Sequence, residues 1–303
     1  MLVWFLVSVV IFLGVVMWQW PDRKLRVIGC DVGQGDAILI TKGFAQILVD
    51  GGPPNGDVLT CLGHYLPFWD RRIELVVMTH PQLDHHGGLV EVLRRYQVEV
   101  FLTGDEVNES EAYERLVTTI LEQDVVVTIA HQGMRLRVEG IELEVLWPKD
   151  MSRDVWKTLE AGDWQHFDGC ADIHCVLGNF MTEMPGDLNV ESVTILLRYG
   201  EFTALLTGDL NASFEEELVN DGLIGDIDLL KVAHHGSRTG ESNKLLEVVK
   251  PEVAIVSVGK ENRFGHPHES VMDGLRDHGV YVYRTDVVGD VVVVSDGTGW
   301  DIE

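Results

Sequence analysis

The sequence predicts an α/β protein, a four-layer αββα sandwich preceded by one N-terminal transmembrane helix. Short runs rich in Val, Ile and Leu alternate with helical segments in two successive halves of the chain, a pattern that two sheets covered by outer helices accommodate. Polar clusters stand at the ends of apolar runs in both halves. The first residues, in contrast, form one apolar stretch without a charge.

Residues 1–21 are predicted to be a membrane anchor. The stretch from Leu2 to Trp20 carries no charged residue and has about the length that crosses a bilayer as a helix. Trp4 and Trp18 stand near its two ends, which suits the two membrane–water interfaces. A cleaved signal peptide would have a basic start and a small-residue cleavage site, and neither is present. We therefore expect a single-pass protein of the cell membrane.

The sequence leaves open the side of the membrane on which the body lies. Arg23, Lys24 and Arg26 follow the apolar stretch, which favours a cytoplasmic body by the positive-inside rule. Cys170 and Cys175 could instead form a disulfide, which would indicate an oxidising, outward location.

The composition is that of a large acidic globular protein. Of its 303 residues 46% are hydrophobic, and the formal charge is −26. Such a charge repels nucleic acid at long range, which counts against a passive nucleic-acid binder with a basic face. It does not exclude an enzyme whose bound metals neutralise phosphate locally.

Residues 25–303 are predicted to form one domain. The first half reads as strands at 25–31, 36–41 and 45–50, a helix at 58–66, a strand at 73–78, a helix at 89–93, a strand at 98–102, a helix at 110–123 and three strands within 125–147. Cys30, in the first of these strands, is expected to be a buried thiol. An irregular insertion occupies about 150–187. The second half reads as strands at 192–199 and 203–207, a helix at 214–220, and strands at 228–233, 252–258, 281–284 and 291–295.

Residues 79–88 hold the densest cluster of candidate metal ligands. His80, Asp84 and His85 fall within six residues, with Gln82 between them. The cluster follows an apolar run and precedes a helical one, so it stands at the carboxyl end of a strand, where α/β proteins usually bind ligands. Imidazole nitrogens and carboxylate oxygens packed this closely bind borderline divalent cations. The sequence therefore predicts a metal site.

Further polar motifs end other strands. Asp31-Val-Gly-Gln-Gly-Asp36 is a glycine turn, and it is not a nucleotide loop because no helix follows it. The later motifs are Asp50-Gly-Gly, Thr207-Gly-Asp209, His234-His235-Gly-Ser237 and Gly265-His266-Pro.

The order of these motifs resembles the metallo-β-lactamase superfamily, and more closely its ComEC branch, the competence proteins implicated in DNA uptake. That branch carries Asp-Val-Gly-Gln-Gly-Asp after a last membrane helix, and later Leu-Lys-Val-x-His-His-Gly-Ser, which matches residues 230–237. The resemblance covers nearly everything from Leu25 onward. It does not include the DNA-binding fold or the many-helix pore of ComEC.

The resemblance implies a role for each motif residue. His80 would bind one metal, Asp84 and His85 the other, Asp209 would bridge both and His266 would complete the second site. The catalytic set would be His234, His235, Asp84 and Ser237. Side chains that orient ligands or contact substrate would be Asp31, Asp36, Asp50, Gln82, Asn189 and Arg238.

Two positions depart from the superfamily pattern. Gln82 stands where histidine is frequent, and Asn189 lies near the place of a further histidine that this chain lacks. Both changes leave the first metal site short of nitrogen ligands, which favours Mn²⁺ over Zn²⁺ there. We expect one or two divalent ions, Zn²⁺ or Mn²⁺.

The predicted function is that of a membrane-anchored, metal-dependent hydrolase of a phosphodiester, with DNA as the expected substrate and other DNA-uptake components as possible partners. His234 and His235 favour this reaction, since an imidazole beside metals binds a phosphate oxygen or protonates a leaving alkoxide. Lys231, Arg238 and Arg263 either assist there or serve solubility. The alternatives are hydrolysis of a small phosphodiester, such as a phosphocholine ester, and a non-catalytic DNA-uptake scaffold with a degenerate metal site.

Overall fold

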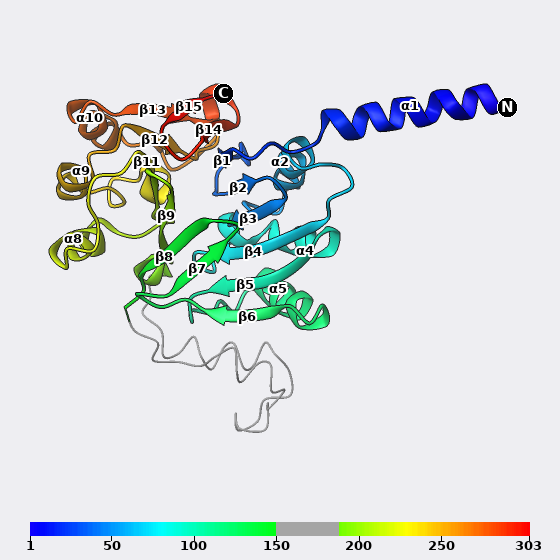
Figure 1. The fold of residues 1–303 in the computed structure, drawn as a ribbon. Coiled ribbons are helices and arrows are strands. Elements are labelled where there is room, and N and C mark those ends of the chain that lie inside the picture. The colour runs from blue at the N-terminus through cyan, green and yellow to red at the C-terminus, as the bar shows by residue number, and fades with distance from the viewer. Residues whose placement is uncertain (150–187) are drawn as a thin grey trace, which may run out of the picture.

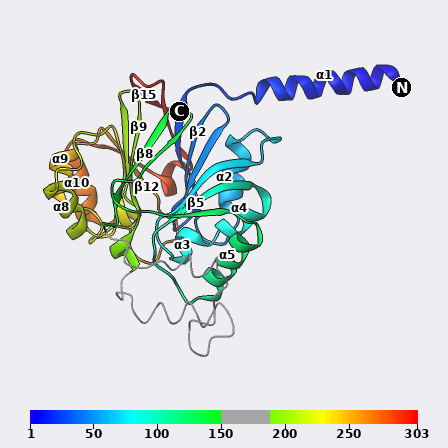
Figure 2. The same cartoon turned by 60° about the horizontal axis from the view of Figure 1, so that its bottom comes forward.

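A computed structural model describes residues 1–149 and 188–303. The expected insertion at about 150–187, with Cys170 and Cys175, lies outside the described residues. The body has four layers, with two sheets face to face and helices outside each (Figures 1 and 2). The predicted αββα sandwich is therefore confirmed.

The first sheet contains eight strands in the order β15-β14-β1-β2-β3-β4-β5-β6. Its strands β3 to β6 run parallel, while β15, β14, β1, β2 and β3 alternate in direction. The strands are β1 Leu25–Gly29, β2 Ile38–Lys42, β3 Ala45–Val49, β4 Arg72–Met78, β5 Gln97–Thr103, β6 Val126–Ile129, β14 Val291–Ser295 and β15 Trp300–Ile302.

The second sheet contains seven strands in the order β13-β12-β11-β10-β9-β8-β7. Here β10 to β13 run parallel. The strands are β7 Arg135–Val138, β8 Ile141–Trp147, β9 Thr194–Tyr199, β10 Phe202–Leu206, β11 Leu229–Lys231, β12 Val253–Val256 and β13 Tyr281–Arg284. Each sheet thus has a parallel half whose carboxyl ends lie at one edge.

The helices cover the outer faces of the sheets, with α2, α4 and α5 on the first and α8, α9 and α10 on the second (Figure 2). Short helical turns also interrupt several loops. The helices of the body are α2 Asp57–Tyr65, α3 Leu83–His86, α4 Leu89–Arg95, α5 Glu111–Glu122, α8 Ala212–Asn220, α9 Asn243–Val249, α10 Glu269–Asp277 and α11 Thr285–Val288, with 3₁₀ turns η2 Leu188–Glu191 and η3 Ala233–Gly236.

Three apolar cores separate the four layers, because neighbouring residues of a strand face opposite sides of its sheet. In β3 and β4, Leu48 and Val76 pack toward the outer helices. Ile47, Leu75 and Val77 pack between the two sheets. A third core lies between the second sheet and its helices. Strands buried on both faces explain the nearly continuous apolar runs.

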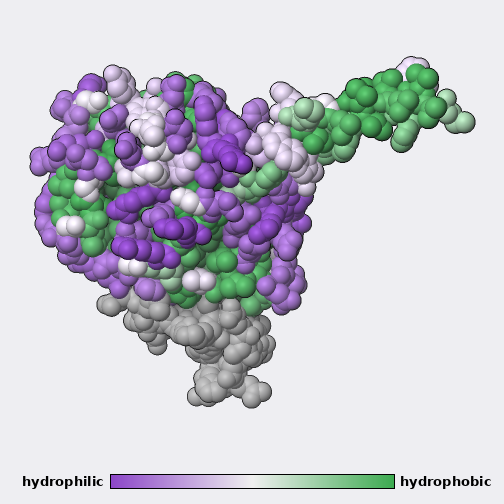
Figure 3. Space-filling view, viewed as in Figure 1, coloured by the Kyte–Doolittle hydropathy of each residue, from purple (hydrophilic) through white to green (hydrophobic). Residues whose placement is uncertain are grey.

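The N-terminal helix α1 (Leu2–Trp18) projects from the body with no buried residue (Figure 1). Figure 3 shows apolar side chains along its visible surface. It has 17 residues, and no helix in the described part of the chain combines the length and the apolarity needed to cross a membrane. The structure therefore does not show the transmembrane helix that the sequence predicts.

Cys30 is not the buried free thiol that the sequence predicts. It forms a disulfide with Cys61 of α2, and both side chains are buried in the core between the first sheet and its helices. The bond links the end of β1 to the outer helical layer. The pairing depends on how α2 packs against the sheet, which the local sequence around Cys30 does not reveal.

Candidate metal centre

Four loops bring polar side chains together at the carboxyl ends of parallel strands. Asp50 follows β3, His80 follows β4, Asp209 follows β10 and His235 follows β11. Since β3 and β4 are parallel neighbours in one sheet, and β10 and β11 in the other, the two halves of the chain contribute to one site between the sheets.

His80, His85 and Asp209 form the buried part of this site. All three side chains are almost inaccessible to solvent, and each offers a ligand atom within 4.8 Å of those of the other two. The His85 Nε2 atom lies 3.3 Å from Asp209 Oδ1. The rings of His80 and His85 are 4.2 Å apart.

Asp84 and His235 extend the site toward solvent. The His235 Nε2 atom lies 3.6 Å from Asp84 Oδ2 and 3.6 Å from Asp209 Oδ2. Asp84, His85 and His235 form a second compact group of potential ligands. The side chain of Asp84 is 32% exposed, so the site is open on this side.

Hydrogen bonds fix the tautomers of three histidines. The Nδ1–H of His85 donates to Asp50 Oδ2 at 2.8 Å, and that of His235 donates to the carbonyl of Ser257 at 2.9 Å. Thr79 Oγ1 donates to Asp50 and so accepts from His80 Nδ1. Each ring therefore turns its Nε2 atom toward the site, as metal-binding histidines do.

Asp50 is anchored from two sides. Its carboxylate accepts the backbone N–H of Thr79 at 2.8 Å and the Thr79 hydroxyl at 2.7 Å. Burial raises the pKa of Asp50, while His85 and Thr79 oppose that rise. Asp50 also occupies a left-handed backbone conformation, with φ of 60°. The role that the family resemblance implies for Asp50, to orient a ligand, agrees with this geometry.

Asp36 and Lys231 form a buried ion pair behind His235. Lys231 Nζ lies 2.6 Å from Asp36 Oδ2 and donates to the carbonyl of Val232. Asp36 Oδ1 lies 3.5 Å from His235 Nδ1. Burial would raise the pKa of Asp36, but the charges of Lys231 and His235 outweigh it and hold that pKa well below its usual value. Lys231 is thus neither a substrate-facing nor a solubilising cation.

The donor set fits a divalent cation. The Nε2 atoms of His80, His85 and His235 and the Oδ1 atom of Asp209 are buried without a hydrogen-bond partner, a costly state that a bound cation relieves. Nitrogen and carboxylate ligands together suit Zn²⁺ or Mn²⁺. The identity of the metal is a prediction.

The protonation of the histidines supports the same fit. Burial lowers the pKa of His80 to about 3, so that ring is neutral and free to bind a metal. Burial alone would also lower the pKa of His235, but the carboxylates of Asp209 and Asp36 raise it to about 10. Without a metal, protons therefore balance the carboxylates, and a bound cation would replace them.

The loop that presents His234 and His235 has an unusual backbone. Both residues occupy the left-handed region, with φ of 50° and 55°, which costs about 1–3 kcal/mol for each non-glycine residue. The His234 N–H donates to the carbonyl of Gly208 at 3.1 Å, which ties the loop to the turn that carries Asp209. Strain held this way is typical of functional sites.

His266 lies at the rim and outside the compact ligand groups of the described residues. Its ring is 5.8 Å from that of His234 and 6.4 Å from that of His235. His234 is half-buried, with Nε2 at 3.7 Å from Asp209 Oδ2. The geometry therefore favours His235 over His266 as a ligand, although the sequence suggested the reverse division.

Gln82 and Asn189 are hydrogen-bonded to each other. Gln82 Nε2 donates to Asn189 Oδ1 at 2.6 Å. Gln82 stands where the resemblance leads one to expect histidine, and Asn189 lies near the place of the further histidine that this chain lacks. The side of the centre next to His80 is therefore poor in nitrogen ligands.

Three other candidate residues lie apart from the ligand groups. The backbone N–H of Asp31 donates to Asp290, and the hydroxyl of Ser237 contacts that of Thr239 at 3.3 Å. Arg238 is exposed.

Sequence reasoning missed two groups that orient the histidines, Thr79 and the Ser257 carbonyl, because neither belongs to a recognisable motif. Lys231, in contrast, interrupts the apolar run 229–233, and this was a sequence signal for its buried ion pair with Asp36.

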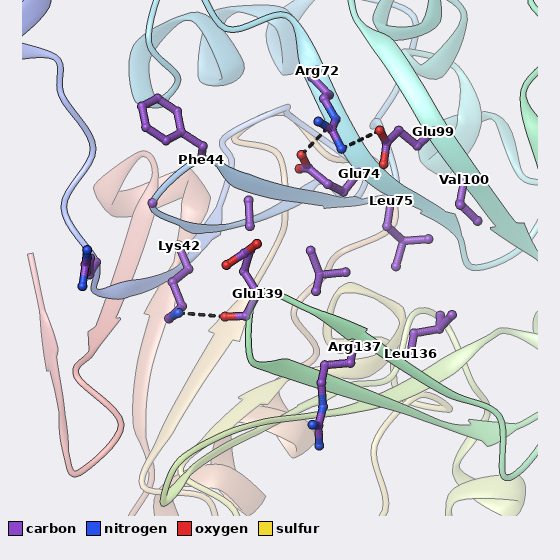
Figure 4. A pocket seen from close by; sticks show the side chains of 14 residues that line it. Lys42, Phe44, Arg72, Glu74, Leu75, Glu99, Val100, Leu136, Arg137 and Glu139 are labelled. Atoms are coloured by element: carbon purple, nitrogen blue, oxygen red, sulfur yellow. Dashed lines mark hydrogen bonds and ion pairs between the residues drawn. The ribbon is translucent and has the colours of Figure 1, made fainter.

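A large cavity of about 940 Å³ lies elsewhere in the described body. It opens beside the starts of β4 and β5, at the opposite end of these strands from His80 (Figure 4). Its charges are largely paired internally, since Arg72 contacts Glu74 and Glu99 and Lys42 donates to the carbonyl of Glu139. As far as the structure describes its lining, this cavity has no group of potential metal ligands, so we place the chemistry at the histidine cluster.

Known proteins match this chain over most of its body. A model of the metallo-beta-lactamase superfamily matches residues 30–260. Recombination protein 2 of Haemophilus influenzae is 31% identical over 267 residues, which cover 87% of this chain and 28% of that protein. Competence protein ComA of Neisseria gonorrhoeae is 26% identical over 272 residues, which cover 89% and 32%. The chain thus spans less than a third of the length of these curated relatives.

Solved structures share the fold at low sequence identity. The metallo-beta-lactamase fold protein YhfI from Bacillus subtilis has a TM-score of 0.53 and 11% identity, over 89% of this chain and 100% of that one. CmlA, a diiron beta-hydroxylase from Streptomyces venezuelae, has a TM-score of 0.52 and 15% identity, over 90% and 54%. Because the matching family model spans both halves of the site, from His80 to His235, the chain belongs to the metallo-β-lactamase superfamily of metal-dependent hydrolases.

Proposed function

We propose that the protein is a metal-dependent phosphodiesterase that cleaves DNA. The observation that carries this proposal is the strained loop beside the ligand groups, where His234 faces Asp209 from a half-exposed position. A bound divalent cation would lower the pKa of water and neutralise charge on phosphate oxygens. The similarity to competence proteins supports DNA as the substrate.

The side chains divide the work of such a reaction. His80, Asp84, His85, Asp209 and His235 would hold the cation. Asp50 orients the His85 ring and the Ser257 carbonyl orients the His235 ring, each through a hydrogen bond to Nδ1. His234 Nε2 remains at the open side, where it would protonate the departing alkoxide. The exposed guanidinium of Arg238 lies two residues after Gly236 and would attract the substrate phosphate.

Cleavage of a single-stranded oligonucleotide after metal removal and reconstitution tests the proposal. We expect activity with Mn²⁺ or Zn²⁺ and none after chelation. His234→Ala should lower the rate by about 10²–10⁴ and retain its metal, whereas Asp209→Ala should lose both. His278→Ala, an exposed histidine of the α10 C-terminus, is the matched control.

Two outcomes would replace the proposal. If the metal-loaded wild type cleaves no phosphodiester, a scaffold with a degenerate site becomes the better account, which the Gln82–Asn189 hydrogen bond favours. If it cleaves only a small diester such as a phosphocholine ester, the reaction class stands and DNA is the wrong substrate.

We further propose that α1 holds the body at a cell membrane. Its side chains from Leu2 to Phe12 are exposed and almost all apolar, a surface that water disfavours. The full chain should sediment with membranes, and a chain that begins at Asp22 should remain in the soluble fraction. Recovery of the intact full chain from the soluble fraction without detergent would contradict this.

The Cys30–Cys61 bond bears on the side of that membrane. Buried disulfides persist in oxidising compartments, so we propose that the body faces outward, against the preference given by the basic residues after α1. Part of that basic charge is compensated, since Arg26 pairs with Asp22 at 2.7 Å. Protease digestion of intact cells should remove the body, and protection of the body would place it inside.

A further inference from the structure

An exposed aromatic ring stands at the rim of the metal centre. The side chain of Phe264 is 71% exposed in the loop between β12 and α10. Burial of a phenylalanine ring is normally favourable, so a ring that stays in water beside the metal centre indicates a binding role. Its exposure leaves the Phe264 ring accessible to a substrate.

Hydrogen bonds hold the loop around Phe264 in place. Asn262 Nδ2 donates to the carbonyls of Gly259 and His266 at 3.0 and 2.9 Å, and the N–H of His266 donates back to Asn262 Oδ1. The N–H of His268 donates to the carbonyl of Gly236 at 2.8 Å, which joins this loop to the His234–His235 loop. The exposure of Phe264 therefore belongs to a fixed loop.

The ring is the outer member of a series that leads to the ligand groups. Phe264 and His266 lie with their centroids 5.7 Å apart and their planes at 26°. His266 and His235 lie 6.4 Å apart, also at 26°. His235 in turn faces Asp84 and Asp209. A flat group on the free face of Phe264 would thus continue a stack of rings beside the centre.

Positive charges accompany this ring. Lys260 and Arg263 in the same loop and Arg238 in the adjoining loop are exposed, and none forms an ion pair with another residue of the described ranges. The exposed negative charges of the same region are those of two glutamates, Glu261 and Glu269. The local balance is slightly positive in a chain of net charge −26.

We propose that Phe264 is a stacking platform for a nucleobase of single-stranded nucleic acid, and that the neighbouring cations attract its backbone. This inference rests on the proposed function and narrows its substrate class. Aromatic rings combined with basic side chains are the usual means of binding single strands, because every base has a π face. A paired base in a duplex does not offer that face, and a phosphocholine ester has no base at all.

The experiment compares the metal-reconstituted wild type with Phe264→Ala and Phe264→Trp. The substrates are a short thymidine strand, an abasic strand of the same length and a duplex. Phe264→Ala should raise the KM for the thymidine strand about 5- to 150-fold, the loss expected for one stacked base. Phe264→Trp, which keeps a flat aromatic ring at this position, should have about the KM of the wild type. With the abasic strand and the duplex, the difference between wild type and Phe264→Ala should disappear.

Binding provides a second measurement that is independent of turnover. A 2-aminopurine base in the single strand should lose fluorescence on binding to the wild type, through stacking, and lose much less on binding to Phe264→Ala. Tyr281→Ala is the matched control, since Tyr281 is also 71% exposed but stands at the amino end of β13, away from the carboxyl-end loops.

Three results would overturn the stacking inference while leaving DNA cleavage intact. The first is an unchanged KM in Phe264→Ala. The second is a rise of KM in Phe264→Ala that is equal for the abasic and the thymidine strands. The third is a KM of Phe264→Trp that is as high as that of Phe264→Ala. Absence of any phosphodiester cleavage by the wild type would instead overturn the proposed function. In that case the fluorescence measurement still decides whether a base stacks on Phe264.

Discussion

At the scale of single residues, the metal centre depends on side chains that never reach the substrate. Asp50 receives three hydrogen bonds, from His85 and from the amide and hydroxyl of Thr79. A carboxylate placed this way fixes the ring that it holds and raises the basicity of its other nitrogen.

Asp50→Ala should therefore weaken metal binding by about 10- to 100-fold without preventing folding. Titration of the metal-free protein with Zn²⁺, followed by calorimetry, measures this. Asp57→Ala, which removes a carboxylate from the exposed start of α2, should bind like the wild type. An unchanged affinity in Asp50→Ala would mean that the bond to His85 has no part in metal binding.

His235 and His266 make a second test at this scale. The Nε2 atom of His235 points at two carboxylates, while His266 lies outside the compact groups of the described residues. We therefore expect His235→Ala to lose more bound metal than His266→Ala, as measured by elemental analysis after dialysis. The opposite order would restore the division of ligands that the sequence suggested.

At the scale of elements, two buried acidic side chains, Glu215 and Glu241, lie beside the loop that carries His234 and His235. Glu215 of α8 accepts the backbone N–H of Ser242 at 2.8 Å, and the carboxylate of Glu241 is buried near it. Burial raises the pKa of Glu241 to about 8, although the Ala233 amide and Lys231 lower it. Burial and Glu241 also raise the pKa of Glu215.

The sign of the resulting pH dependence follows from linkage. The unfolded chain ionises Glu241 near its ordinary pKa of 4.5, whereas the folded protein keeps the proton until about pH 8. This group therefore costs stability as the pH rises from 4.5 to 8. Glu241→Gln should match the wild type near pH 4.5 and exceed its free energy of unfolding by a few kcal/mol at pH 8.

Urea unfolding of both proteins at several pH values checks this prediction, with Glu247→Gln on the exposed side of α9 as the control. A stability difference that does not change between pH 4.5 and 8 would show that Glu241 ionises normally in the folded protein.

The link between β1 and α2 gives another prediction at this scale. Cys30 and Cys61 are 31 residues apart in sequence, and a disulfide that closes such a loop typically contributes about 2–4 kcal/mol. Replacement of both by alanine should lower the free energy of unfolding by that amount. If both thiols of the native protein react with an alkylating reagent after unfolding without reductant, the bond does not form.

At the scale of the whole molecule, the sequence predicts the architecture well because its signals are local. Apolar runs and turn residues predicted nearly every strand, and the apolar run before residues 79–88 placed His80 at the carboxyl end of a strand, whereas the place of Asp209 beside it was implied by the family resemblance. Helices α9 and α10 and strand β15 were missed, since their short and mixed patterns compete with loops. The helix α1 was predicted, but its ability to cross a membrane is not shown.

The contacts that the sequence could not reveal join distant positions. Lys231 and Asp36 meet only when the two sheets pack, and no local pattern pairs them. The position of His235 depends on two left-handed residues in succession, a backbone that non-glycine residues rarely adopt. The division of roles between His235 and His266 is therefore a product of tertiary structure.

The metal content of the purified protein tests the central claim most directly, because every proposed step depends on the cluster around Asp209. After loading with Mn²⁺ or Zn²⁺ and dialysis, the wild type should retain at least about one equivalent of metal, and Asp209→Ala should retain little. A wild type that retains none, or an Asp209→Ala variant that retains as much as the wild type, would contradict the assignment of this cluster as the metal centre.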